Sequence, residues 1–160
     1  MHFRTLDSPI GQLLLAGDPS GLRLLLFSNG RDQVRPRPEW QPDHGALDDA
    51  ARQLSEYFEG KRRTFEMRLA PEGTAFQKTV WNALLEIPYG ETTSYGELAR
   101  RIGNPKAVRA VGLANGSNPI SIVIPCHRVI GSNGSLVGYG GGLPVKQALL
   151  ALERGQRTLL

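Results

Sequence analysis

The apolar residues of this chain change their spacing once, at the sequence APEG at positions 70–73. Before it, short apolar runs alternate with turn sequences such as DSPIG and GDPSG, which predicts an antiparallel meander of strands. After it, apolar residues recur every three to four positions, which predicts helices. We therefore expect two units of different class within the 160 residues, with a boundary that gives domains 1–73 and 74–160.

The first unit is expected to be a small sheet covered by one helix. Strands are predicted at residues 3–6, 12–16 and 22–27, and an irregular stretch rich in proline and charge follows over residues 28–42. Apolar residues recur at helical spacing over residues 47–58, and the next glycine supplies a stop signal. A further strand is predicted where Phe65, Met67 and Leu69 alternate with polar residues.

The second unit carries several helix start signals. Most of them are capping residues before an apolar run, and the middle two of the helices that they open are expected to form a helix-turn-helix around Gly103. The first helix must end near Ile87, because Pro88 follows. The signals are Thr74 with Gln77, Ser94 with Glu97, Asn104 with Pro105, and Pro144 at the start of a last helix that runs to Glu153.

Charge is distributed unevenly between the two halves. Residues 1–73 hold ten Lys and Arg against eleven Asp and Glu, whereas residues 74–160 hold nine against four, a net charge of +5. The helix from Pro105 combines Lys106 and Arg109 with Ala107, Ala110 and Gly112, which would let its backbone approach a nucleic-acid groove closely. A solvated basic face that binds nothing remains the alternative on charge alone.

The only cysteine, Cys126, cannot form an internal disulfide, and one cysteine with three histidines does not give the spacing of a structural zinc site. It is either a small buried hydrophobe or a nucleophile, and the adjacent His127 favours the second. Neighbouring residues of an extended strand point to opposite faces. If the apolar run before Cys126 is a strand, either the backbone bends there or a water molecule bridges the two side chains.

The sequence SIVIPCHRVIGSNG, with NPKAVRAVGLANGSNP before it and GYGGG after it, resembles the O6-alkylguanine-DNA alkyltransferases, and the resemblance extends from about Thr74 to Glu153. It implies an α+β fold, with a small RNase H-like N-terminal antiparallel sheet domain and a mostly helical, winged-helix-like C-terminal domain. The activity implied is DNA repair by irreversible transfer of an alkyl group from O6-alkylguanine, and possible transfer from O4-alkylthymine, to the protein, once per molecule.

The resemblance also implies roles for individual residues. Cys126 would accept the alkyl group, His127 would deprotonate it through a water molecule, Glu153 would orient His127, and Asn118 would stabilise the preceding turn. Tyr95 would push on the DNA and protonate the departing base, while Arg109 would fill the gap left by a flipped base. The remaining DNA contacts would come from Gly96, Asn104 and Ser132, and the base pocket from Val129, Tyr139 and Gly140, where a glycine leaves room for bulky alkyl groups.

Other classes of function remain open at this point. A cysteine hydrolase would use the same Cys126 and His127 but would turn over, because water can cleave a thioester. A non-catalytic helix-turn-helix lesion-binding module would leave Cys126 merely packed. The sequence discriminates against both, because PCHRV directly follows the predicted DNA-binding helices and the acceptor cysteine is present.

The partner expected is double-stranded DNA carrying alkylated bases, bound through its minor groove by a monomer. No cofactor is expected, because the lesion itself is the alkyl donor, and no metal is expected, because the only cysteine lies in the predicted active site. The chain has neither a basic, then apolar, leader at its N-terminus nor a run of about 18 apolar residues, so we expect a cytoplasmic protein that does not enter a membrane.

Overall fold

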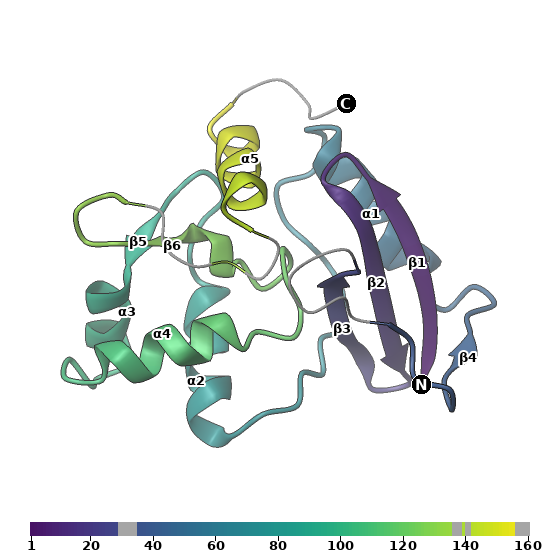
Figure 1. Ribbon diagram of the computed structural model, residues 1–160, viewed down its shortest axis with the longest axis horizontal. Helices are drawn as coiled ribbons and strands as arrows, with labels where there is room; N and C mark the ends of the chain where they lie inside the picture. The colour runs from purple at the N-terminus through teal and green to yellow at the C-terminus, as the bar shows by residue number, and fades with distance from the viewer. Residues whose placement is uncertain (29–34, 136–138, 140–141, 156–160) are drawn as a thin grey trace.

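The computed structural model describes residues 1–28, 35–135, 139 and 142–155. Figure 1 shows a sheet with one helix on the N-terminal side and a group of helices on the C-terminal side. The sheet contains β1 (His2–Ser8), β2 (Gly11–Asp18), β3 (Gly21–Phe27) and β4 (Gln41–Pro42), in the order β3-β2-β1-β4. The predicted meander is therefore confirmed, since β1, β2 and β3 are consecutive antiparallel neighbours.

The strand β4 corrects one expectation, because residues 28–42 were predicted to be irregular throughout. Gln41 and Pro42 pair in parallel with His2 and Phe3 of β1. A proline lacks the N–H group that a central strand must donate, so Pro42 is tolerated because β4 is the outer edge of the sheet. Two residues of pairing leave no hydrophobic alternation from which the sequence could have predicted this strand.

Each face of the sheet is covered by a different segment. The helix α1 (Asp48–Phe58) lies on one face (Figure 1), and its Leu54 and Tyr57 belong to the same buried cluster as Leu13 and Leu15 of β2. On the other face, Trp40 packs with Leu14 and Ala16 of β2. Successive side chains of a strand point to opposite faces, so the buried run in β2 supplies both layers.

The segment that follows α1 does not form the predicted strand at residues 65–69. It makes a single bridge, in which Leu22 donates from its N–H to the carbonyl of Arg68 and accepts from the N–H of Ala70. The free edge of β3 is shared, because Leu25 forms a second bridge with Ile120 of the C-terminal domain. Neither segment can pair along the whole strand, so the alternation in the sequence is real but the strand is not formed.

The C-terminal domain contains five helices and a pair of two-residue strands among the described residues. Figure 1 places α2, α3 and α4 together on the side away from the sheet, with α5 above them. The strands β5 and β6 pair in parallel. The elements are α2 (Ala75–Leu84), β5 (Thr93–Ser94), α3 (Tyr95–Arg101), α4 (Val108–Gly116), the 3-10 helix η1 (Cys126–Arg128), β6 (Val129–Ile130) and α5 (Leu143–Glu153).

Most helix boundaries agree with the start and stop signals. The capping box of α2 is present in both directions, because Thr74 accepts from the N–H of Gln77 and the Gln77 side chain accepts from the N–H of Thr74. At α3 only half of the predicted box forms. The Ser94 side chain accepts from the N–H of Glu97. The Glu97 carboxylate, however, pairs with Arg100 and Arg101 instead of accepting from the N–H of Ser94.

The start of α4 is corrected by the structure. Asn104 and Pro105 were predicted to open this helix, but the carbonyl of Asn104 accepts from the N–H of Ala107 in a separate turn, and the helix begins at Val108. Lys106 therefore lies before the helix. The two helices still form the predicted pair, because Gly103 takes a positive φ of 80° that reverses the chain after α3 at no steric cost.

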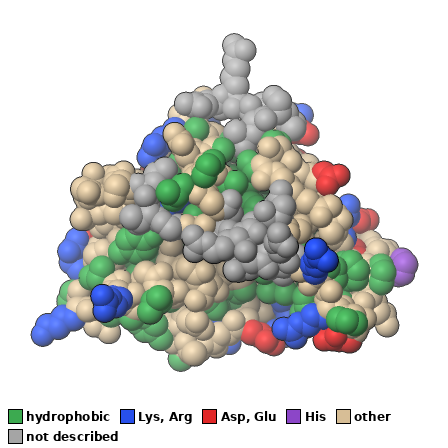
Figure 2. All heavy atoms as spheres, in the orientation of Figure 1, with side chains coloured by type: hydrophobic (Ala, Val, Ile, Leu, Met, Phe, Trp, Pro, Cys, Tyr) green, Lys and Arg blue, Asp and Glu red, His purple; other side chains and the backbone are tan. Residues whose placement is uncertain are grey.

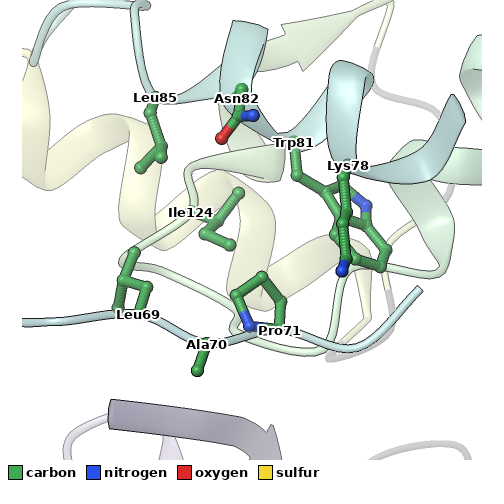
Figure 3. Close-up of a pocket in the computed structure, with 8 residues that line it drawn as sticks. All are labelled: Leu69, Ala70, Pro71, Lys78, Trp81, Asn82, Leu85 and Ile124. Atoms are coloured by element: carbon green, nitrogen blue, oxygen red, sulfur yellow. The ribbon is translucent and has the colours of Figure 1, made fainter. Parts of the chain in front are cut away.

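The connection between the domains packs against α2. In Figure 3, Leu69, Ala70 and Pro71 lie opposite Lys78, Trp81 and Leu85, around a pocket that holds no thiol, imidazole or carboxylate among its lining residues. The Trp81 indole donates to the carbonyl of Ala114 on α4 at 2.8 Å. A Cβ atom on Gly73 would lie 2.5 Å from the Trp81 ring, so the chain can pass this point only as glycine.

Candidate active site and DNA-binding surface

A buried turn directly precedes Cys126, and the side chain of Asn118 holds it closed. Asn118, which is 6% exposed, donates from its side-chain amide to the carbonyl of Ile124 at 2.8 Å and accepts from the N–H of Ile120 at 2.9 Å. Between them Ile122 takes a φ of 73°, which is rare for a β-branched residue. The two bonds from Asn118 hold this strained turn closed.

Cys126 and His127 are not on an extended strand, which corrects the interpretation of the apolar run before them. Residues 121–124 form turns, and Cys126 to Arg128 form η1. The backbone therefore bends, which was one of the two alternatives, and both side chains are buried. The apolar run looks like a strand in the sequence because all of its residues enter the core, and burial on every side removes the periodicity that separates turns from strands.

His127 and Glu153 are brought together from positions 26 apart in the chain. Nε2 of His127 lies 2.7 Å from Oε2 of Glu153, and both side chains are almost completely buried. The helix α5 delivers Glu153 at its last residue, directly over η1. The other ring nitrogen of His127, Nδ1, is buried and has no hydrogen-bond partner among the described residues.

Glu153 is the centre of a larger network than the sequence predicted. Its two oxygens accept from Nε and Nη2 of Arg128 at 2.7 and 3.1 Å, and Oε2 also accepts from the hydroxyl of Tyr57 at 2.6 Å. Burial alone would raise the pKa of Glu153, but the hydrogen bonds and charges of His127 and Arg128 lower it to about 2. The carboxylate is therefore ionised at neutral pH.

The histidine and the thiol are shifted towards their neutral forms. Burial lowers the pKa of His127, and the bond to Glu153 only partly opposes this effect. Burial also raises the pKa of Cys126, while the Asn118 amide and the positive charge of Lys146 act in the opposite direction. Lys146 is fully buried and donates from Nζ to the carbonyl of Val129 at 2.7 Å.

Tyr95 lies at the start of α3, between the buried cluster and the outer surface. Its ring is close to α4, since a Cβ atom added to Gly112 would lie 3.8 Å from it. Burial raises the pKa of Tyr95, and the neighbouring Cys126 adds to the shift. Tyr95 is thus a phenol that stays protonated at neutral pH close to the thiol.

The residues predicted to contact DNA lie on the outside of the helix pair. Asn104 is exposed in the turn before α4, Arg109 is exposed in the first turn of α4, and Ser132 is exposed in the turn after β6. Gly96 is half-buried beside Tyr95 on α3. In Figure 2, the lower left, where Figure 1 places α3 and α4, shows Lys and Arg side chains without acidic ones, whereas both kinds are seen over the N-terminal domain.

The predicted base pocket is placed only in part. Val129 is fully buried in β6, and Tyr139 packs edge-on against Phe27 of β3, with ring centroids 5.8 Å apart. Gly140 lies outside the described residues.

Sequence reasoning missed four residues of the cluster, one of which is Lys146 of α5. Arg128 could have been found, because it is an arginine within PCHRV, directly after the candidate base. Asn115 is buried on α4, and its amide lies 3.5 Å from the carbonyl of Cys126, but an asparagine at that helical position gives no signal. Tyr57 was counted as an apolar core residue of α1, and nothing in the sequence relates it to Glu153.

The described residues bear on two further expectations, one about membranes and one about metals. No helix in that part of the chain has the length and apolar character needed to cross a membrane. Within the same residues there is no group of three or more His, Cys, Asp and Glu side chains that could hold a metal ion.

Comparisons with known proteins cover almost the whole chain. Residues 1–71 match the family described as "6-O-methylguanine DNA methyltransferase, ribonuclease-like domain", and residues 75–155 match its "DNA binding domain". These matches confirm the α+β fold class, with a ribonuclease-like sheet domain followed by a helical DNA-binding domain.

Individual relatives agree. The methylated-DNA--protein-cysteine methyltransferase of Methanosarcina acetivorans is 55% identical over 153 residues, which is 96% of this chain and 98% of the relative. A crystal structure of Mycobacterium tuberculosis OGT in complex with DNA superposes with a TM-score of 0.90 at 55% identity, over 96% of this chain and 93% of the other. The chain belongs to the 6-O-methylguanine DNA methyltransferase family and is a DNA-repair protein that acts by direct alkyl transfer.

Proposed function

We propose that the sulfur of Cys126 takes the alkyl group from O6 of a guanine in DNA and keeps it. The observation that carries this proposal is the buried chain of contacts in which Asn118 holds the turn before Cys126 while Glu153 holds the adjacent His127 at 2.7 Å. In this step the bond between sulfur and alkyl carbon forms, and the bond between that carbon and O6 breaks. The thioether has no leaving group, so each molecule acts once.

The proton path follows from the shifted pKa values. A thiol with a raised pKa and a histidine with a lowered pKa rest as a neutral pair, so the thiolate forms only when His127 takes the proton. Nε2 is engaged by Glu153, which leaves Nδ1 to receive the proton through a bridging water molecule. Tyr95, a protonated phenol near Cys126, would donate a proton so that guanine leaves as a neutral base.

The helix pair is proposed to bind double-stranded DNA through the minor groove, with one protein molecule per lesion. A stacked base hides O6, so the damaged nucleotide must rotate out of the duplex to reach a buried thiol. Arg109 is exposed on the first turn of α4, where it could occupy the vacated space, and the small side chains of this helix allow close approach. Gly96, Asn104 and Ser132 would contact the backbone, and Val129 and Tyr139 would line the base pocket.

This role assigns the protein to the compartment that holds the DNA, which is the cytoplasm in a cell without a nucleus.

Mass spectrometry of the intact protein tests the proposal. Titration with a duplex that carries one O6-methylguanine is expected to add one methyl group per protein, on Cys126, in proportion to the lesion supplied. The Cys126→Ala variant should bind the same duplex and gain no mass. Repeated turnover, or methyl transfer by Cys126→Ala, would refute the proposal. Binding without any mass change in the unaltered protein would instead support a lesion-binding module.

A further inference from the structure

The Glu153 carboxylate receives a hydrogen bond from the other domain. Tyr57 lies on α1, in the N-terminal domain, and its hydroxyl donates to Oε2 of Glu153 at 2.6 Å. This is the same oxygen that faces Nε2 of His127 at 2.7 Å. Tyr57 is completely buried, and its neighbours on α1, Leu54 and Phe58, belong to the same buried hydrophobic cluster.

We infer that Tyr57 is a positioning residue for alkyl transfer, through which the N-terminal domain holds Glu153 against His127. This inference rests on the proposed roles of Cys126, His127 and Glu153.

The geometry shows why the Glu153 carboxylate needs a second hydrogen-bond donor besides Arg128. Arg128 donates to both of its oxygens, with Nε to Oε1 at 2.7 Å and Nη2 to Oε2 at 3.1 Å. A guanidinium fork binds a carboxylate most strongly when both bonds are short. Without an opposing donor, the carboxylate would rotate towards Arg128, and Oε2 would leave His127. Tyr57 approaches from the other domain and fixes Oε2 where both the histidine and the tyrosine can reach it.

The tyrosine is suited to a constant donor role. Burial raises the pKa of Tyr57 well above its ordinary value, and the negative charge of Glu153 raises it further, so the hydroxyl keeps its proton wherever the protein is folded. Its ring is fixed by three aromatic neighbours, Phe58, Phe65 and Tyr89, with centroids 5.4 to 6.2 Å away. The position of the hydroxyl is therefore set by packing rather than by the bond it donates.

Any pH dependence of this network must come from other groups than Tyr57. The titratable or charged groups that act on Glu153 or on His127 are Tyr57 from α1, Tyr89 after α2, His127 and Arg128 of η1, Tyr139, and Lys146 of α5. The tyrosines stay protonated, because burial raises the pKa of each. His127 and Cys126 are thus the groups whose ionisation near neutral pH a variant at Tyr57 would change.

The test is Tyr57→Phe in the full chain, which removes the hydroxyl and keeps the ring. Single-turnover methyl transfer from a duplex with one O6-methylguanine is followed from acid to alkaline pH. We expect a rate at neutral pH about tenfold lower, the scale of one lost hydrogen bond to a charged group. The inflection of the pH–rate profile that reports the ionisation of Cys126 should move up by as much as about one pH unit. The reason is that His127 accepts the proton of the thiol less readily when Glu153 no longer holds it in place.

The matched control is Phe58→Leu, which alters the same aromatic cluster and leaves the hydroxyl bond in place. It is expected to lower the melting temperature without moving the inflection. A second measurement combines Tyr57→Phe with Glu153→Gln. If Tyr57 acts through Glu153, the loss caused by Tyr57→Phe should largely disappear in the Glu153→Gln background, because the two effects then share one path.

Three outcomes overturn the inference: a Tyr57→Phe rate equal to that of the unaltered protein at every pH, the same inflection shift in Phe58→Leu, or the same loss in both Glu153 backgrounds. If Glu153→Gln is too unstable to assay, the pH profiles of the two single variants decide. The unaltered protein is measured first. If its Cys126 gains no methyl group, the proposed function fails, whereas methylated Cys126 with an unaffected Tyr57→Phe rejects the role of Tyr57 alone.

Discussion

Glu153 is an ionised carboxylate with only 5% of its surface exposed, which is costly unless every lone pair is used. Its partners, Arg128, His127 and Tyr57, supply four contacts between 2.6 and 3.1 Å. Arg128 balances the charge and also donates to the carbonyl of Ile87 at 2.7 Å, which ties the turn after α2 to η1. Stability and the proposed chemistry therefore depend on the same side chain.

The first prediction concerns this residue. Glu153→Gln removes the negative charge that stabilises a protonated His127, so the apparent pKa of Cys126 should rise and alkylation at neutral pH should slow by roughly tenfold or more. The pH dependence of the single-turnover rate measures both effects. Glu56→Gln is the control, because Glu56 of α1 pairs with Arg52 and Arg62 and is not one of the partners of Glu153. An unchanged profile in Glu153→Gln would remove Glu153 from the mechanism.

At the scale of elements, the helix pair carries Tyr95 and Arg109, and η1 carries Cys126. The helices α3 and α4 pack closely on each other and present Tyr95 on the inner side and Arg109 on the outer side. The helix η1 and the turn before it are held by side chains, Asn118 and Arg128, rather than by a long ladder of backbone bonds. The proposed binding surface is thus made of α-helices, and the proposed acceptor thiol lies on a short 3-10 helix that the core keeps in place.

The second prediction belongs to α4. Arg109→Ala should slow repair within duplex DNA far more than it slows reaction with free O6-benzylguanine, because only the duplex requires the base to leave the stack. The loss on duplex DNA should be at most roughly a hundredfold, which corresponds to the few kcal/mol of unstacking. Single-turnover rates on the two substrates give the ratio.

Lys106→Ala is the matched control for Arg109→Ala. It removes the same charge from the turn just before α4 and should weaken DNA binding, most clearly at low salt, while the ratio of the two rates stays unchanged. If Arg109→Ala slows both substrates equally, Arg109 has a structural role instead.

For the whole molecule, the contact between Tyr57 and Glu153 joins the two domains at the proposed active site. The edge of β3 joins them again, where Leu25 donates to the carbonyl of Pro119 and accepts from the N–H of Ser121. The buried cluster that contains Leu13 and Tyr57 also contains Val80, Leu98 and Cys126, so one continuous core spans both domains. We expect the two domains to unfold together in a single transition.

The third prediction is the pH dependence of that transition. The pKa of Glu153 is about 2 in the folded chain against 4.5 as its ordinary value, so its stabilisation is present above pH 4.5 and is lost as the pH falls towards 2. A shift of this size corresponds to about 3 kcal/mol. The pKa of His127 is also lowered, so below its ordinary value of 6.5 this residue too favours the unfolded chain. Both groups act in the same direction.

Urea unfolding at a series of pH values measures this effect. The free energy of unfolding should fall steadily between about pH 6.5 and 3, and Glu153→Gln should flatten the lower part of the curve. Equal slopes in both proteins below pH 4.5 would show that other carboxylates, and not Glu153, cause the acid sensitivity.

Local signals in the sequence determined most of the elements. These signals act within a few residues, so each can be predicted without knowing the rest of the chain. They are the turns around β2, the glycine after α1, the capping box at Thr74 and the glycine that ends α3, Gly103. The motif PCHRV and its neighbours similarly identified the family. The sequence by itself therefore determined the two classes of domain, the order of most of their elements and the family.

Only the tertiary structure decided where buried segments bend and which distant residues meet. The core surrounds residues 120–129 on all sides, so their side chains carry no periodicity, and the turn at Ile122 and the 3-10 helix at Cys126 could not be predicted. Tyr57 and Glu153 are 96 positions apart and meet because two domains pack together. A hydrogen bond of this kind depends on the packing of both domains, and no local pattern in the sequence can encode it.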